Sequence, residues 1–166
     1  MLPTSTAYVF VYGTLRRGES RDINLLLPAP RWLGLASVPG VLHDLGDYPG
    51  MILQGESLVR GEVYEISEEL ERQLDEIEEV WPQKTGEYNK RQVLVQLDST
   101  PSVLLLHIES SSHYLSNGLK KINCILYEIS LERTRGMQVI AGGDWVQHRF
   151  EKCSATTVQK ISSSEK

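Results

Sequence analysis

Apolar residues first occur as one uninterrupted run near the start of the chain, and this run predicts a strand. Tyr8-Val-Phe-Val-Tyr12 shows no alternation of apolar and polar positions. A strand of this kind is expected to be buried on both faces. Gly13 ends the run, and because glycine adopts backbone angles closed to other residues, it predicts a turn at the strand end.

Between residues 31 and 66, short apolar runs alternate with glycine and proline. This is the pattern of short strands joined by tight turns. The cluster Gly46-Asp-Tyr-Pro-Gly50 predicts a loop, and residues 58–66 predict the strand that follows. Much later in the chain, the apolar run at residues 122–129 predicts another core strand.

The pattern changes to a helical period after Ser67. Leu70, Leu74 and Ile77 follow at i, i+4 and i+7, which places them on one face of a helix. Ser67 is suited to cap its N-terminus, and acidic residues occupy the first turn, where the helix dipole favours negative charge. We expect this helix to end at about Val80.

Glu78 differs from the other acids of this helix by its place on the helical wheel. At about 100° per residue it lies on the flank of the apolar stripe, nearer the core than the others. It also lies in the last turn, where the dipole disfavours a negative charge. Burial and the dipole both raise a carboxyl pKa, which suits a general acid or base near neutral pH. The alternative is a boundary glutamate whose side chain turns out to water.

The loop Gly13-Thr14-Leu15 is a second candidate for a binding or catalytic role. A turn at a strand end can direct N–H groups toward a carboxylate, a phosphate or a developing oxyanion. The alternative is an ordinary turn. Arg16 and Arg17 follow the loop, either facing a substrate carboxylate or, as we favour, lying in solvent. Tyr48 has the size either to line a pocket or to close a core.

Length and charge narrow the class of protein. A chain of 166 residues fits one domain, and a net charge of −5 argues against a nucleic-acid or anionic-membrane partner. The chain shows no membrane-spanning run and no signal-peptide pattern at its start, so we expect a cytoplasmic protein. The four histidines show no metal-ligand spacing, and we expect Cys124 to be buried and Cys153 incidental.

The chain after residue 150 is polar and without a clear period. We therefore predict one domain over residues 1–150 and a mobile C-terminal tail over residues 151–166. Residues 102–109 form an apolar segment that fits either a strand or a short helix, followed by a serine cluster and an Asn117-Gly118 turn. Its role stays open between capping a pocket and extending the sheet.

Five short motifs, taken in order, resemble the gamma-glutamylcyclotransferase-like family, of the gamma-glutamylamine cyclotransferase type. Its Tyr-Gly-Ser/Thr-Leu loop stands here as Tyr12-Gly-Thr-Leu15, and its Leu-Asp-x-x-Glu motif as Leu74-Asp-Glu-Ile-Glu78. The other three are Gly40-Val-Leu-His-Asp-Leu-Gly-Asp-Tyr-Pro49, Gly61-Glu-Val-Tyr64 and the Gly-Asp-Trp motif ending at residue 145. The family usually carries glycine after the glutamate, where this chain has Glu79. Its Tyr-x-Arg pattern begins here at Tyr88 and reaches either Lys90 or Arg91.

The resemblance implies an α+β fold with a mixed, barrel-like sheet flanked by a few helices. It also implies an acyltransferase-type enzyme that releases 5-oxoproline and an amine from a gamma-glutamyl amide. In that reading Glu78 is the acid/base, and the substrate is bound by Tyr12, Gly13, Thr14, Leu15, Tyr48 and Tyr88. No metal or other cofactor is implied. The partner is a small-molecule gamma-glutamyl substrate.

Several points stay open from the residues alone. The leaving amine and the oligomeric state are not indicated. A non-catalytic module that binds a small ligand in the same pocket is the alternative function. A serine hydrolase lacks its Gly-x-Ser-x-Gly motif here, and a nucleotide-binding protein lacks both a P-loop and a Gly-x-Gly-x-x-Gly motif.

Overall fold

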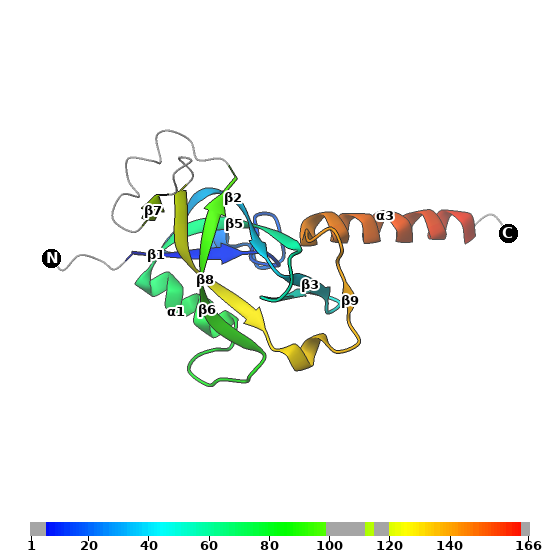
Figure 1. Ribbon diagram of the computed structural model, residues 1–166. Helices are drawn as coiled ribbons and strands as arrows, with labels where there is room; N and C mark the ends of the chain where they lie inside the picture. Colours follow the sequence, from blue (N-terminus) through cyan, green and yellow to red (C-terminus); the bar gives the residue numbers. More distant parts are fainter. Residues whose placement is uncertain (1–5, 99–111, 115–119, 164–166) are drawn as a thin grey trace.

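The computed structural model describes residues 6–98, 112–114 and 120–163. Two helices and nine strands, with two short 3-10 turns, make up this part of the chain (Figure 1). The elements are β1 (Thr6–Val11), η1 (Ile23–Leu25), β2 (Arg31–Pro39), β3 (Val41–Asp44), β4 (Pro49–Ile52), β5 (Leu58–Ser67), α1 (Glu68–Ile77), β6 (Tyr88–Leu97), β7 (Ser112–Tyr114), β8 (Lys120–Ile129), η2 (Leu131–Thr134), β9 (Gln138–Val139) and α3 (Trp145–Ser163).

Five strands close into a barrel-like sheet in the order β1-β5-β2-β6-β8, with β8 returning to β1. β1 pairs antiparallel with β5 and parallel with β8, where Val9 lies opposite Ile125. The remaining pairs of the barrel are antiparallel. A smaller sheet contains β4, β3 and β9. The expected α+β fold with a mixed barrel-like sheet is therefore confirmed.

β1 is buried on both faces, as its unbroken apolar run predicts. Tyr8, Phe10 and Tyr12 belong to one core cluster with residues of β2, β5, β6 and β8. Val9 and Val11 belong to a second cluster with α1. Side chains of a strand alternate between its faces, so β1 separates the two cores and carries the following loop out from between them.

α1 begins as predicted and ends slightly early. The Ser67 hydroxyl accepts the backbone N–H of Leu70, which caps the helix. Leu70 and Leu74 are fully buried against the second core cluster. The last helical residue is Ile77 rather than one near Val80. Glu78 thus lies at the C-cap of α1, at the edge of the barrel.

The segment that we expected to be a tail is largely helical. α3 runs through residue 150 to Ser163 and projects away from the barrel (Figure 1). Polar contacts hold its first half: Asp44 accepts from Lys152 at 2.7 Å and contacts His148 at 2.8 Å. Glu19 accepts from the Trp145 indole at 3.2 Å and from Arg149 at 3.0 Å. Apart from Trp145, which is buried in the core, these anchoring contacts are polar, so hydrophobic periodicity does not reveal the helix.

The prediction that Cys124 is buried is confirmed, and Cys153 is exposed. The apolar segment 102–109 and the Asn117-Gly118 turn lie outside the described residues. Between them, β7 pairs with β8 at the edge of the large sheet. In the part of the chain that the structure describes, no helix is long and apolar enough to cross a membrane.

Candidate active site

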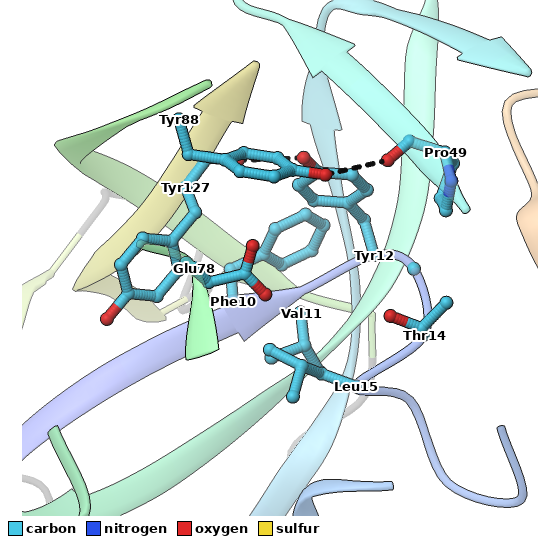
Figure 2. Close-up of a pocket in the computed structure, with 10 residues that line it drawn as sticks. Phe10, Val11, Tyr12, Thr14, Leu15, Pro49, Glu78, Tyr88 and Tyr127 are labelled. Atoms are coloured by element: carbon cyan, nitrogen blue, oxygen red, sulfur yellow. Dashed lines mark hydrogen bonds between the residues drawn. The ribbon is translucent and has the colours of Figure 1, made fainter. Parts of the chain in front are cut away.

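The Glu78 side chain is buried and faces a cavity at the end of β1. Its exposed fraction is 8%, and Figure 2 shows the carboxylate pointing between Tyr88 and the end of β1. Burial raises the pKa of Glu78 to about 7, and the nearby Glu87 and Glu79 carboxylates add to that rise, while Arg21 opposes it. A carboxyl group with this pKa both accepts and donates a proton near neutral pH.

The end of α1 is shaped by a turn that places Glu78 inward. Val80 N–H donates to Asp75 C=O at 2.9 Å and Glu79 N–H donates to Glu76 C=O at 3.2 Å. These two bonds form a Schellman motif, whose C′ residue adopts the left-handed conformation. Glu79 occupies that position with φ of 54°. A glutamate here adopts the backbone conformation that the family's usual glycine adopts readily.

Replacing Glu79 by glycine is expected to stabilise the protein by about 1 kcal/mol, because a side chain at this position carries the left-handed strain. For a domain of this size, that corresponds to a rise in Tm of about 2–4 °C. Thermal unfolding followed by circular dichroism measures the change. The matched control is Glu76→Gly, which puts glycine inside the helix and should lower Tm. A fall in Tm for both variants would contradict the assignment.

Within the described residues, the loop after β1 uses its carbonyl groups but not its N–H groups in backbone hydrogen bonds. Its carbonyl groups are used: Gly13 C=O accepts from Arg16 at 3.0 Å, Thr14 C=O from Arg21 at 2.9 Å, and Leu15 C=O from Ile23 at 3.0 Å. Within residues 6–98, 112–114 and 120–163, no acceptor receives the three N–H groups of residues 13–15. They are available to bind an oxygen of a ligand.

Close packing and an ion pair hold this loop in place. A Cβ atom on Gly13 would lie 2.7 Å from Cγ of Pro49, so only glycine fits. Arg16 is buried and pairs with Glu62 at 3.3 Å and Asp144 at 2.9 Å. The interpretation of Arg16 as a solvated residue is therefore wrong. Arg17 is exposed, as expected, and its guanidinium lies 5.8 Å from the centre of the Trp32 ring.

Aromatic and apolar side chains line a small inner cavity between the loop and Glu78. The Tyr12 hydroxyl donates to Tyr127 C=O at 2.7 Å and accepts from Met51 N–H at 3.3 Å. The Tyr88 hydroxyl lies 3.4 Å from Pro49 C=O (Figure 2). The cavity is lined by Phe10, Val11, Tyr12, Gly13, Thr14, Leu15, Pro49, Glu78, Tyr88 and Tyr127. A small ligand entering it is largely shielded from water, which strengthens polar interactions inside.

An outer pocket adjoins the inner cavity and shares Thr14, Glu78 and Tyr88 with it. Arg21, Ile77, Glu79 and Glu87 also line this outer pocket. Tyr48 lies here, where its hydroxyl donates to Glu87 at 2.6 Å. Glu87 also pairs with Arg133 at 2.9 Å, so Tyr48 is held at the mouth of the site.

Every residue that the sequence nominated for the site lines one of these two connected pockets. Tyr12, Gly13, Thr14, Leu15, Glu78 and Tyr88 line the inner cavity, and Tyr48 lines the outer pocket. Sequence reasoning missed Pro49, Tyr127, Arg21 and Glu87 as parts of the site. Pro49 ends one of the family motifs, and Glu87 lies beside Tyr88, but neither signal assigned a role to these residues.

A polar cluster behind the cavity supports the end of α1. The Tyr127 hydroxyl points away from the cavity and donates to Asp75 at 2.7 Å (Figure 2). Lys90 donates to Asp75 at 2.8 Å and to Glu71 at 2.5 Å. Arg91 instead pairs with Glu128 at 2.7 Å. Of the two candidates for the family's arginine position, Lys90 is the one that contacts α1.

Known proteins resemble this chain in sequence and in fold. The model of the family described as gamma-glutamyl cyclotransferase, AIG2-like, matches residues 9–147. The chain belongs to this family. All the residues that line the inner cavity fall within the matched range.

Two individual similarities agree with the family. The gamma-L-glutamyl-butirosin B gamma-glutamyl cyclotransferase of Niallia circulans is 46% identical over 72 residues, which are 43% of this chain and 45% of that protein. This chain thus spans about half the length of the curated relatives that it matches. The crystal structure of Bacillus subtilis YkqA superposes with a TM-score of 0.61 at 25% identity, over 90% of this chain and 43% of that one.

A mouse AIG2-like protein has the same fold, with a TM-score of 0.57 at 22% identity, over 80% of this chain and 84% of that chain. The family fold is thus found in proteins from bacteria and mammals. Among the described residues of this chain, no group of three or more His, Cys, Asp or Glu side chains is arranged to hold a metal ion.

Proposed function

We propose that this chain is a gamma-glutamyl cyclotransferase, which converts a gamma-glutamyl amide into 5-oxoproline and a free amine. One observation carries the proposal: a buried carboxyl with a pKa of about 7 and a loop with unused N–H groups line the same small cavity. The family and the name of the Niallia circulans relative support it.

The gamma-glutamyl group spans the inner cavity and the adjoining outer pocket, with its gamma-carbonyl at the loop after β1 and the leaving amine toward the outer pocket. The walls there fold the flexible substrate so that its α-nitrogen approaches its own gamma-carbonyl carbon. Holding two groups of one molecule in this way removes much of the entropic barrier of ring closure. The Tyr12 and Tyr88 hydroxyls stay protonated, because burial raises the pKa of each above its usual value.

Glu78 in its ionised form accepts a proton from the α-ammonium group, and the resulting amine attacks the gamma-carbonyl carbon. The new C–N bond closes a five-membered ring and places negative charge on the carbonyl oxygen. N–H groups of Gly13, Thr14 and Leu15 donate to that oxygen. Such donors stabilise the tetrahedral intermediate more than the ground state, which lowers the barrier.

The intermediate collapses as the bond to the leaving nitrogen breaks. Glu78, now protonated, donates its proton to that nitrogen. Glu78 then accepts a second proton from the ring nitrogen and passes it to the amine, so two protons move in total, the ring nitrogen keeps one hydrogen and the amine leaves as an ammonium ion. Glu78 returns to its starting state. The sequence of steps uses neither a covalent enzyme intermediate nor a cofactor.

The activity is expected to fall as the pH drops below about 7. Only ionised Glu78 accepts the proton, and its folded-state pKa lies near 7 rather than near its ordinary value of 4.5. The kcat/KM of the free enzyme should therefore lose about tenfold per pH unit on the acid side of that pKa. Initial rates in constant-ionic-strength buffers from about pH 4 to pH 9 measure it. An acid limb with a midpoint near 4.5 would contradict the role given to buried Glu78.

A substrate panel tests the proposed function itself. Gamma-glutamyl amino acids, a gamma-glutamyl polyamine and a gamma-glutamyl lysine side chain are incubated with the protein, and 5-oxoproline and the amine are quantified by mass spectrometry. Equal amounts of both products are expected from at least one compound. The α-linked isomers are the control, because their amide carbonyl is not placed for closing the same ring. Binding of the gamma-glutamyl compounds without any product would instead indicate a ligand-binding module.

A further inference from the structure

Arg21 is a cation at the site without a partner in the described structure. Its backbone N–H donates to Thr14 C=O at 2.9 Å, which ties it to the loop after β1. Its side chain lines the outer pocket together with Glu78. Across the described residues, no acidic group forms an ion pair with its guanidinium, whereas nearby Arg16 and Arg133 each pair with carboxylates.

The inner cavity provides no competing cation. Its ten lining residues include no lysine, arginine or histidine, and Glu78 is the one carboxylic acid among them. A negatively charged group of a ligand near Glu78 would therefore meet repulsion, unless Arg21 balances it. The charge of Arg21 already acts on Glu78, because it opposes the rise in the pKa of that carboxyl group.

Every gamma-glutamyl amide carries one negative group regardless of its leaving amine, namely the α-carboxylate. This carboxylate is attached to the same carbon as the α-ammonium group. When Glu78 contacts the α-ammonium, covalent geometry places the carboxylate within a few ångströms of Glu78. A planar guanidinium that donates two parallel hydrogen bonds matches a carboxylate well.

We propose that Arg21 binds the α-carboxylate of the gamma-glutamyl group and so selects substrates in which that carboxylate is free. This inference rests on the proposed function for its substrate, but it concerns recognition rather than the chemical steps. Arg21 then has a second effect. By pairing with the carboxylate, it removes a negative charge that would hold the proton on the α-ammonium group, which eases transfer to Glu78.

The test compares a matched pair of substrates that differ only at the α-carboxylate. L-gamma-glutamyl methylamide has a free α-carboxylate and an uncharged leaving side, and its analogue carries an α-carboxamide instead. The wild-type protein should prefer the acid by about 10- to 100-fold in kcat/KM, the range expected for hydrogen bonds to a charged group. Arg21→Ala should reduce that preference to within about threefold, and Arg21→Lys should restore part of it. Arg72→Ala, an exposed arginine of α1 that lines neither pocket, should keep the wild-type preference.

Two further readouts separate this inference from the proposed function. Calorimetric binding of 5-oxoproline and its carboxamide requires no turnover, and Arg21→Ala should weaken only the binding of the acid. The acid limb of the pH profile should move to higher pH in Arg21→Ala, because Arg21 lowers the pKa of Glu78. Equal losses on both substrates, or unchanged discrimination with unchanged binding, would overturn the role of Arg21. Selective loss of 5-oxoproline binding in a protein without turnover would support the Arg21 site and refute the enzyme.

Discussion

Glu78→Gln is expected to lower kcat by roughly 10²- to 10⁴-fold, the usual contribution of a general acid or base. Glutamine has nearly the same shape, but it neither accepts the α-ammonium proton nor returns one to the leaving amine. The Kd for 5-oxoproline should stay within a few-fold of wild type, since the product needs no proton transfer. Steady-state kinetics and calorimetry on the same preparations measure both quantities.

Glu76→Gln is the matched control for this substitution. Glu76 lies on the same helix, is exposed, and lines neither pocket, so its replacement should leave kcat unchanged. Wild-type turnover in Glu78→Gln would contradict the proton-transfer role. Loss of ligand affinity together with normal folding would favour a binding module in which Glu78 pairs with an amine.

Glu78→Gln should also make the fold more stable above neutral pH. The folded-state pKa of Glu78 is about 7, against an ordinary 4.5, so the folded protein holds a proton that the unfolded chain releases between these values. Stability therefore decreases as the pH rises through that window, by about 3 kcal/mol at most. Glutamine carries no charge, so the variant avoids the free-energy cost of ionising a buried side chain. Chemical unfolding at pH 5 and pH 8 should show the gain of Glu78→Gln at pH 8 alone.

Gly13→Ala is expected to lower kcat by roughly 10²- to 10³-fold, as the loss of an oxyanion donor does in other enzymes. The added methyl group would lie 2.7 Å from Cγ and 3.0 Å from Cδ of Pro49. A proline ring has little freedom to move aside, so the loop or Pro49 has to shift. The N–H groups of the loop then miss the position where the oxyanion develops.

Gly142→Ala is the control for the added methyl group, because nothing lies within 4 Å of a Cβ built at that glycine. It should leave kcat and Tm close to wild type. Gly13→Ala should also lower Tm by a few degrees, and circular dichroism at the assay temperature verifies that the variant is folded. A folded Gly13→Ala protein with wild-type kcat would contradict the role of this loop.

The local features of the site could be predicted from the sequence because each depends on neighbouring residues. The unbroken run from Tyr8 to Tyr12 indicated a strand buried on both faces, and β1 is buried on both faces. The helical wheel placed Glu78 beside the apolar stripe, and its side chain is buried. The same position followed from the family motif, so two independent signals agreed on it.

Features that depend on distant parts of the chain could not be predicted. Arg16 contacts Asp144, which is 128 positions away, and no local pattern indicates that a charged residue beside a loop is buried. No local pattern indicated that Arg21 and Glu78 line the same pocket. Similarly, Trp145 and Lys152 anchor α3 to the carboxylates of Glu19 and Asp44, which are distant in sequence.

The central claim is that the α-nitrogen of the substrate, and not water, attacks the gamma-carbonyl carbon. The most direct test is to run the reaction in H₂¹⁸O with a substrate that the panel identifies and to analyse the products by mass spectrometry. The account predicts 5-oxoproline without ¹⁸O, released in equal amount with the amine. Glutamate carrying one ¹⁸O atom in its gamma-carboxyl group would show hydrolysis and would contradict the intramolecular mechanism.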